Sequence, residues 1–140
     1  MEKALKNYII ETNAASRAEM DANPGTIIGM LPDPSEVEYW AERVPTGTLA
    51  EYLRISLETE AYYIIADAYS KGYARSFDFS SMTDEEIQVE IDKAIALMDA
   101  EAKYEVEAEA QAEAEMDKLA ASLSIDRPTL KRWMQEAMIV

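Results

Sequence analysis

The longest regular pattern in the chain occupies residues 83–115, which read TDEEIQVEIDKAIALMDAEAKYEVEAEAQAEAE. Its first half places apolar residues at the three- and four-residue spacing of one helix face: Ile87, Ile91, Ala94, Ile95 and Met98. Thr83 followed three residues later by Glu86 is the capping-box signature with which many helices begin. Alanine and glutamate, which fill the second half, are both strong helix formers. The stretch is therefore predicted to form one long helix through residue 115.

The segments before this helix follow the same pattern. Residues 2–22 carry apolar residues at helical spacing, and Asn23-Pro-Gly ends that helix. Two more capping-box signatures come next: Ser35 with Glu38, and Thr48 with Glu51. They predict a short helix to about Val44 and a longer one that runs to Lys71.

The longer of these two helices is predicted to be the centre of the fold. One face carries Leu49, Leu53, Leu57, Ile64 and Ala68. An apolar arc this wide implies packing partners on more than one side. Because no stretch alternates β-branched and polar residues, the predicted fold is all-α. Its parts are a small helical bundle at residues 1–82, a long acidic helix or connector at 83–115, and a helix-turn-helix-like hairpin at 116–140.

The composition excludes several classes of function. The 140 residues include 28 Asp and Glu against 13 Lys and Arg, a net charge of −15, with neither His nor Cys. Disulfides, imidazole and thiolate metal sites, cysteine nucleophiles and histidine bases are therefore excluded. The sequence also lacks a glycine-rich phosphate loop and a serine nucleophile elbow. We therefore predict no catalytic residue, no metal and no cofactor, and we expect the chain not to be an enzyme.

The hydropathy pattern bears on location. No apolar run approaches the roughly 20 residues that a membrane span needs. The first residues also lack the continuous apolar core of a signal peptide. We therefore expect a cytoplasmic protein, or a virion protein if the chain is of phage origin, without a membrane partner.

The charge is unevenly distributed along the chain. Residues 1–82 hold 13 acidic and 7 basic side chains, whereas residues 83–116 hold 12 acidic and only 2 basic ones. Residues 117–140, with 3 acidic and 4 basic side chains, are slightly basic. Such asymmetry indicates that different segments face different neighbours.

The acidic tract is a candidate partner-binding surface. Its candidate residues are Glu101, Glu105, Glu107, Glu109, Glu113 and Glu115. The tract is interpreted either as a solvated spacer or as a partial nucleic-acid mimic that occupies a basic groove of another protein. Duplex DNA carries one charge per roughly 1.7 Å of axis, whereas this helix carries one net charge per roughly 5 Å. A full mimic would therefore need a second acidic element or a dimer.

The most informative motif covers residues 116–135, MDKLAASLSIDRPTLKRWMQ. It resembles the helix-turn-helix of Fis-like and transposase-type DNA-binding proteins. Their pattern is an alanine in the first helix, an apolar–glycine–apolar turn, a cap, and then Arg-x-Thr-Leu-x-Arg-Trp. The resemblance assigns Ala120 to the close approach of the two helices, Leu123 and Ile125 to the turn, Asp126 or Arg127 to the cap, Pro128 to the first turn of the second helix, and Leu130 and Trp133 to its inner face.

One position departs from the family pattern. Ser124 stands where glycine is usual. The serine must therefore take a positive φ, or the turn must relax slightly.

The resemblance implies DNA binding through the second helix, whose N-terminal residues would reach base edges in the major groove. The candidate residues are Arg127, Thr129, Lys131, Arg132 and Gln135. A DNA-binding protein normally shows a larger basic surface than these residues provide, and the acidic tract lies directly upstream. The same hairpin can instead pack on the body of the protein or dock on another protein.

Three classes of function therefore stay open. The first is a non-enzymatic accessory or regulatory protein that binds DNA through its C-terminal hairpin. The second is an acidic inhibitor of a nucleic-acid-binding partner. The third is a phage assembly or internal virion protein. In each case we expect a protein partner or self-association.

Overall fold

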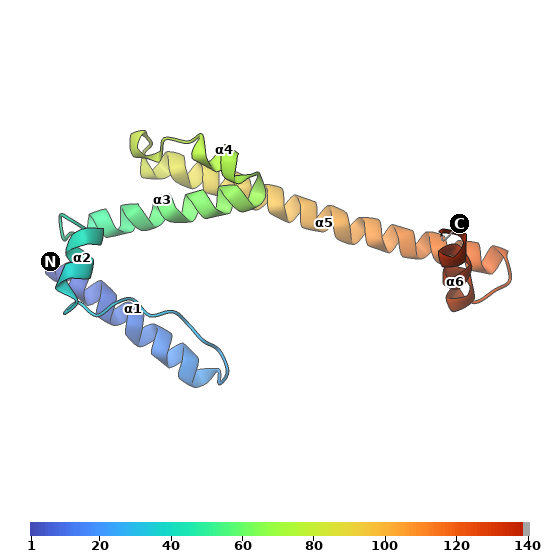
Figure 1. Cartoon of the computed structure of the whole chain (residues 1–140), viewed down its shortest axis with the longest axis horizontal. Helices are drawn as coiled ribbons and strands as arrows, with labels where there is room; N and C mark the ends of the chain where they lie inside the picture. The colour runs from blue at the N-terminus through green and yellow to red at the C-terminus, as the bar shows by residue number, and fades with distance from the viewer. Residues whose placement is uncertain (139–140) are drawn as a thin grey trace. The chain divides into compact units, whose positions relative to one another are not determined.

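The computed structural model describes residues 1–138, and this part of the chain is helical and contains no strand. The elements in Figure 1 are α1 (Lys3–Ala22), α2 (Val37–Arg43), α3 (Leu49–Ala68), α4 (Lys71–Arg75), the 3₁₀ turn η1 (Phe79–Ser81), α5 (Asp84–Ser122) and α6 (Arg127–Met138). The predicted all-α fold is confirmed. The chain divides into two compact units, Met1–Ile91 and Asp92–Val140. Helix α5 begins in the first unit and continues into the second.

The first unit contains a core made by α1 and α2, which we call the α1–α2 cluster. Its buried members are Leu5, Ile9, Trp40 and Val44, and the partly buried Leu31, Tyr39, Leu49 and Tyr52 pack against it. Leu5 and Ile9 lie one turn apart on α1, so they share the inner face of that helix. The Tyr52 ring lies 5.7 Å from the Trp40 ring in an edge-on arrangement, which joins the start of α3 to this core.

Polar side chains fix the loop between α1 and α2. The Asn13 side chain donates from Nδ2 to the Leu31 carbonyl at 2.9 Å and accepts the Leu31 backbone N–H at 2.8 Å. Trp40 Nε1 donates to the carbonyls of Pro32 and Asp33, both at 3.1 Å. These bonds satisfy backbone groups that have no helical partner, so the loop is held along α1 without regular structure of its own.

The sequence prediction for α3 was wrong about the face that is buried. Leu53, predicted to be a core residue, is 44% exposed, whereas Ala61 and Ile65 are the buried residues of this helix. Apolar side chains cover most of the circumference of α3, so periodicity alone does not select the inner side. The helix also ends earlier than predicted, at Ala68, because Ser70 caps α4 by accepting the Tyr73 N–H.

The three predicted capping boxes have different outcomes. Thr83 Oγ1 accepts the Glu86 N–H, and Glu86 returns a carboxylate oxygen to the Thr83 N–H, so this box is confirmed in full. Thr48 Oγ1 accepts the Glu51 N–H at 3.2 Å, which confirms the first half of that box. The box predicted for Ser35 and Glu38 was wrong, because α2 begins at Val37 with no side-chain cap.

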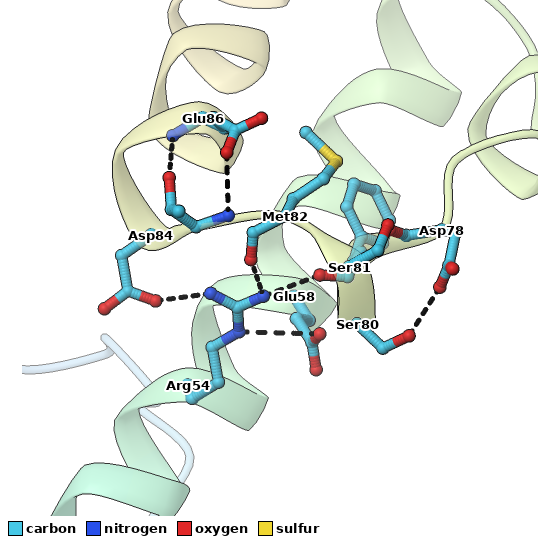
Figure 2. A network of polar contacts seen from close by, with 10 residues as sticks. Arg54, Glu58, Asp78, Ser80, Ser81, Met82, Asp84 and Glu86 are labelled. Carbon is cyan, nitrogen blue, oxygen red and sulfur yellow. Dashed lines mark hydrogen bonds and ion pairs between the residues drawn. The ribbon is translucent and has the colours of Figure 1, made fainter.

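Arg54 connects α3 to the start of α5 (Figure 2). Its guanidinium donates to Asp84 Oδ1 at 2.5 Å and to the carbonyls of Phe79 and Met82 at 2.6 and 2.5 Å, and its Nε lies 3.5 Å from a Glu58 oxygen. Hydrogen bonding to Asp84 raises the pKa of Arg54 above its usual value. One side chain thus satisfies carbonyls around η1 and fixes where α5 begins.

Helix α5 confirms the prediction of one long helix and extends it. The helix has 39 residues and continues to Ser122 without a break at residue 115. The first helix of the predicted C-terminal hairpin is therefore the last part of α5.

Candidate functional site

The candidate site is the hairpin formed by residues 116–138, in which a short turn joins the end of α5 to α6. The turn closes with the two hydrogen bonds of a Schellman motif, from the Ile125 N–H to the Ala120 carbonyl and from the Ser124 N–H to the Ala121 carbonyl. Ser124 has a φ of 53°, so the predicted positive φ on a serine is confirmed. Because this motif requires a left-handed residue after the helix, the serine occupies the place of the usual glycine.

Asp126 caps the second helix of the hairpin. Its Oδ1 accepts the N–H of Thr129, the third residue of α6, at 2.8 Å. Hydrogen bonds from the Thr129 side chain and backbone, together with the charge of Arg132, hold the pKa of Asp126 below its usual value. The capping carboxylate is therefore stabilised in its charged form, which suits the positive end of a helix dipole.

Only part of the predicted inner face of the hairpin is buried. Ala120 and Leu130 are buried, as the resemblance implied. Trp133, which was assigned to the inner face, is 47% exposed, and Leu123 of the turn is 49% exposed. Two short helices are too small to bury several large side chains between them, so the indole stays partly exposed at the edge of their contact. The interpretation of Trp133 as an inner residue was therefore wrong.

Arg127 makes the strongest polar contacts of the hairpin. Its Nη1 donates to Asp117 Oδ1 at 2.7 Å and its Nη2 donates to Glu113 Oε2 at 2.9 Å. Both carboxylates lie on α5, so Arg127 ties α6 to the helix before it. Hydrogen bonding to Asp117 and then to Glu113 raises the pKa of Arg127 above its usual value. A guanidinium that is engaged in this way is not available to read a base edge.

The other four candidate DNA-binding residues have different environments. Thr129 is partly buried and takes part in the Asp126 cap. Lys131, Arg132 and Gln135 are exposed on α6. The structure therefore leaves two cations and one amide of the predicted set accessible on this helix.

The six candidate glutamates of the acidic tract are all exposed on α5. Glu113 differs from the others, because it pairs with Arg127. Within residues 1–138, the remaining five, Glu101, Glu105, Glu107, Glu109 and Glu115, have no ion pair. The tract is thus an exposed acidic surface, and one of its last glutamates, Glu113, pairs with the hairpin.

The sequence interpretation missed the apolar surface of the hairpin. Four large side chains are between 42% and 49% exposed: Leu119, Leu123, Trp133 and Met134. The signal was present in the spacing, because Leu119 near the end of α5 and Leu123 in the turn that follows are four residues apart, on either side of Ala120 in the sequence. The contact between the end of α5 and α6, a helix of 12 residues, is too small to cover all four side chains.

Other chemistry has little basis in the described residues. Residues 1–138 contain no group of three or more Asp or Glu side chains placed to hold a metal ion. None of the helices in this part of the chain is both long and apolar enough to cross a bilayer.

Comparison with known proteins adds nothing to this site: no family model, no curated protein and no solved structure matches the chain. Its function therefore has to be inferred from its own residues.

Proposed function

We propose that the chain is a non-enzymatic, all-helical accessory protein that binds a protein partner through its C-terminal hairpin. The observation that carries this proposal is the half-exposed apolar set Leu119, Leu123, Trp133 and Met134. Exposed apolar groups gathered on one small element are typical of protein interaction sites. Tryptophan is enriched among the residues that dominate binding energy, and methionine adapts to partner surfaces of irregular shape.

The charge of the neighbouring helix supports a partner with a basic surface. Residues 83–116 carry 12 acidic and 2 basic side chains, and five of the candidate glutamates have no ion pair within the described residues. Charges of this kind increase the rate of association with an oppositely charged partner, whereas the apolar anchors supply affinity. Partial nucleic-acid mimicry and a role in phage assembly are both compatible with such a partner.

A photo-cross-linker tests the proposal directly. We would replace Trp133 by a benzophenone-bearing amino acid in the full chain and irradiate it in an extract of the cells that produce it. The matched control carries the same group at Glu136, which is exposed on the same helix. A discrete protein adduct, or an adduct with a second copy, from position 133 alone supports the proposal. Equal labelling from both positions, or none, contradicts it.

DNA binding is the second candidate, and a different observation favours it. Ala120 is buried and Ser124 has a positive φ, two features expected from the resemblance, and Lys131, Arg132 and Gln135 remain exposed. Fluorescence anisotropy with random duplexes near 50 mM salt, where non-specific contacts are strong, measures it. Lys131→Ala and Arg132→Ala should each lower the salt slope by about one if these side chains contact phosphates. Absence of binding by the full chain would remove this candidate without touching the first.

A further inference from the structure

A pocket of about 250 Å³ opens on the α1–α2 cluster, far along the sequence from the hairpin. Its floor consists of the buried core side chains Leu5, Trp40 and Val44. Its walls come from the start of α1, from the chain around α2 and from the loop that follows α2: Met1, Lys6, Pro34, Val37, Ala41, Pro45, Thr46 and Gly47. Most of the lining residues are therefore apolar, polar atoms contribute the rest of the pocket surface, and the fold itself holds these residues in place.

Backbone contacts fix the width of this pocket. The Glu2 N–H donates to the Gly47 carbonyl at 2.7 Å, and the Glu2 side chain accepts the Leu49 N–H at 2.9 Å. Gly47 has a φ of +67°, and a Cβ at this position would lie 3.2 Å from Met1 Cα. Only glycine takes this conformation readily while allowing so close an approach. The wall formed by residues 45–47 is therefore set before any ligand arrives.

The charge at the pocket is opposite to that of the chain as a whole. The sequence contains 28 acidic side chains, yet none of them lines the pocket, whose one charged side chain is Lys6. Within residues 1–138, Lys6 forms no ion pair, so its ammonium is free to meet an incoming anion. A pocket whose lining includes apolar side chains and a lysine, and no acidic side chain, is suited to a molecule that has an apolar body and one negative end.

We propose that this pocket binds a small organic monocarboxylate with a compact aliphatic or aromatic body. The body lies against Trp40 and Val44, and the carboxylate pairs with the Lys6 ammonium at the rim. A cavity of about 250 Å³, slightly below the usual range for ligand sites, limits the ligand to about a dozen non-hydrogen atoms. For a ligand of this size we expect a dissociation constant on the order of a millimolar. The proposal is independent of the function proposed for the hairpin.

The experiment titrates 4-phenylbutyrate into the ¹⁵N-labelled full chain and follows the indole N–H signals by NMR. The sequence has two tryptophans, so Trp133→Phe identifies the signal of Trp40. Trp40 lines the pocket, and its indole N–H is hydrogen-bonded to the carbonyls of Pro32 and Asp33, which makes its chemical shift a sensitive reporter. We expect a saturable shift of the Trp40 signal, with the neutral 4-phenylbutyramide binding more weakly.

Two variants and one control locate the site. Lys6→Gln should weaken 4-phenylbutyrate binding roughly two- to fivefold, as the loss of an exposed ion pair does. Lys3→Gln is the matched control, because Lys3 is an exposed lysine of α1 that does not line the pocket, and it should leave binding unchanged. Ala41→Trp should fill the cavity and abolish binding, and its exposed position lets the chain fold normally. If the Trp40 signal shows no saturable shift at a ligand concentration 10 times the expected dissociation constant, the site is overturned. If the amide binds as tightly as the acid, or if K6Q binds the acid as tightly as the wild type does, the carboxylate assignment is overturned.

Discussion

The α1–α2 cluster and the C-terminal hairpin are both made of two helices and a connection, yet they bury their apolar residues to very different degrees. In the cluster, Leu5 and Ile9 are fully buried and Trp40 is 3% exposed. In the hairpin, the second tryptophan of the chain, Trp133, is 47% exposed. The same type of side chain thus forms the core in one region and the surface in the other. A large apolar side chain that its own fold does not cover is available to a partner.

The two regions also differ in what holds them together. The cluster combines apolar burial with hydrogen bonds from Asn13 and Trp40 to loop carbonyls. The hairpin buries only Ala120 and Leu130, and its other contacts are a helix cap at Asp126 and the ion pairs of Arg127, all at the surface. Exposed ion pairs contribute little to stability, whereas apolar burial contributes most of it. We therefore expect the hairpin to be among the less stable parts of the molecule, from which binding elements are commonly drawn.

The largest expected effect comes from truncating the core of the cluster. Ile9→Ala should lower the free energy of unfolding by about 2–5 kcal/mol, because it leaves a cavity among fully buried side chains. The matched control is Ile10→Ala, because Ile10 is the next residue of α1 and is 55% exposed. That change should stay within about 0.5 kcal/mol of wild type. Urea unfolding followed by circular dichroism measures both, and similar losses for the two variants would contradict the assigned face of α1.

The hairpin should respond to truncation locally. Leu130 is its one large buried side chain, so Leu130→Ala should release α6 from α5 while the cluster stays folded. Met134→Ala, at a half-exposed position on the same helix, is the control. Native-state hydrogen exchange should show lost protection of α6 amides in the first variant and not in the second. Loss of protection in α1 as well would show that the two regions unfold as one.

Local features of the chain could be predicted from the sequence, whereas features that depend on tertiary packing could not. Thr83 and Glu86 marked the start of α5 because a capping box is local and needs no tertiary information. The buried face of α3 could not be predicted, because apolar residues surround that helix and only its packing selects Ile65 over Leu53. The ion pairs of Arg127 were also out of reach. Its partners lie 10 and 14 residues earlier, and they meet it only because the turn at Ser124 reverses the chain.

Replacing the left-handed residue of the turn by glycine should make the hairpin more stable. Ser124 has a left-handed φ of 53°, which costs a non-glycine residue roughly 1–2 kcal/mol. Glycine avoids this cost, but part of the gain is lost because glycine makes the unfolded chain more flexible. Ser124→Gly should therefore stabilise the hairpin by about 0.5–1 kcal/mol, and Ser124→Val should destabilise it. Hydrogen exchange of the α6 amides measures both changes. A loss of protection in the glycine variant would mean that the serine side chain contributes something that the Schellman geometry does not explain.

The smallest expected effect is a pH dependence confined to the hairpin. The pKa of Asp126 is lowered in the folded chain by Thr129 and Arg132, so the capping carboxylate stabilises the hairpin at pH values above the unfolded pKa of about 3.9. This contribution is lost as the pH falls through the lower folded pKa. Many other carboxylates titrate in the same range, and therefore the informative quantity is the difference from Asp126→Asn, which keeps a capping side chain that does not titrate. At neutral pH the aspartate form should protect the α6 amides better, because its charge also meets the positive end of the helix. As the pH falls below about 4, the two exchange profiles should converge. A difference that stays constant down to pH 2 would show that the Asp126 charge makes no contribution to holding α6.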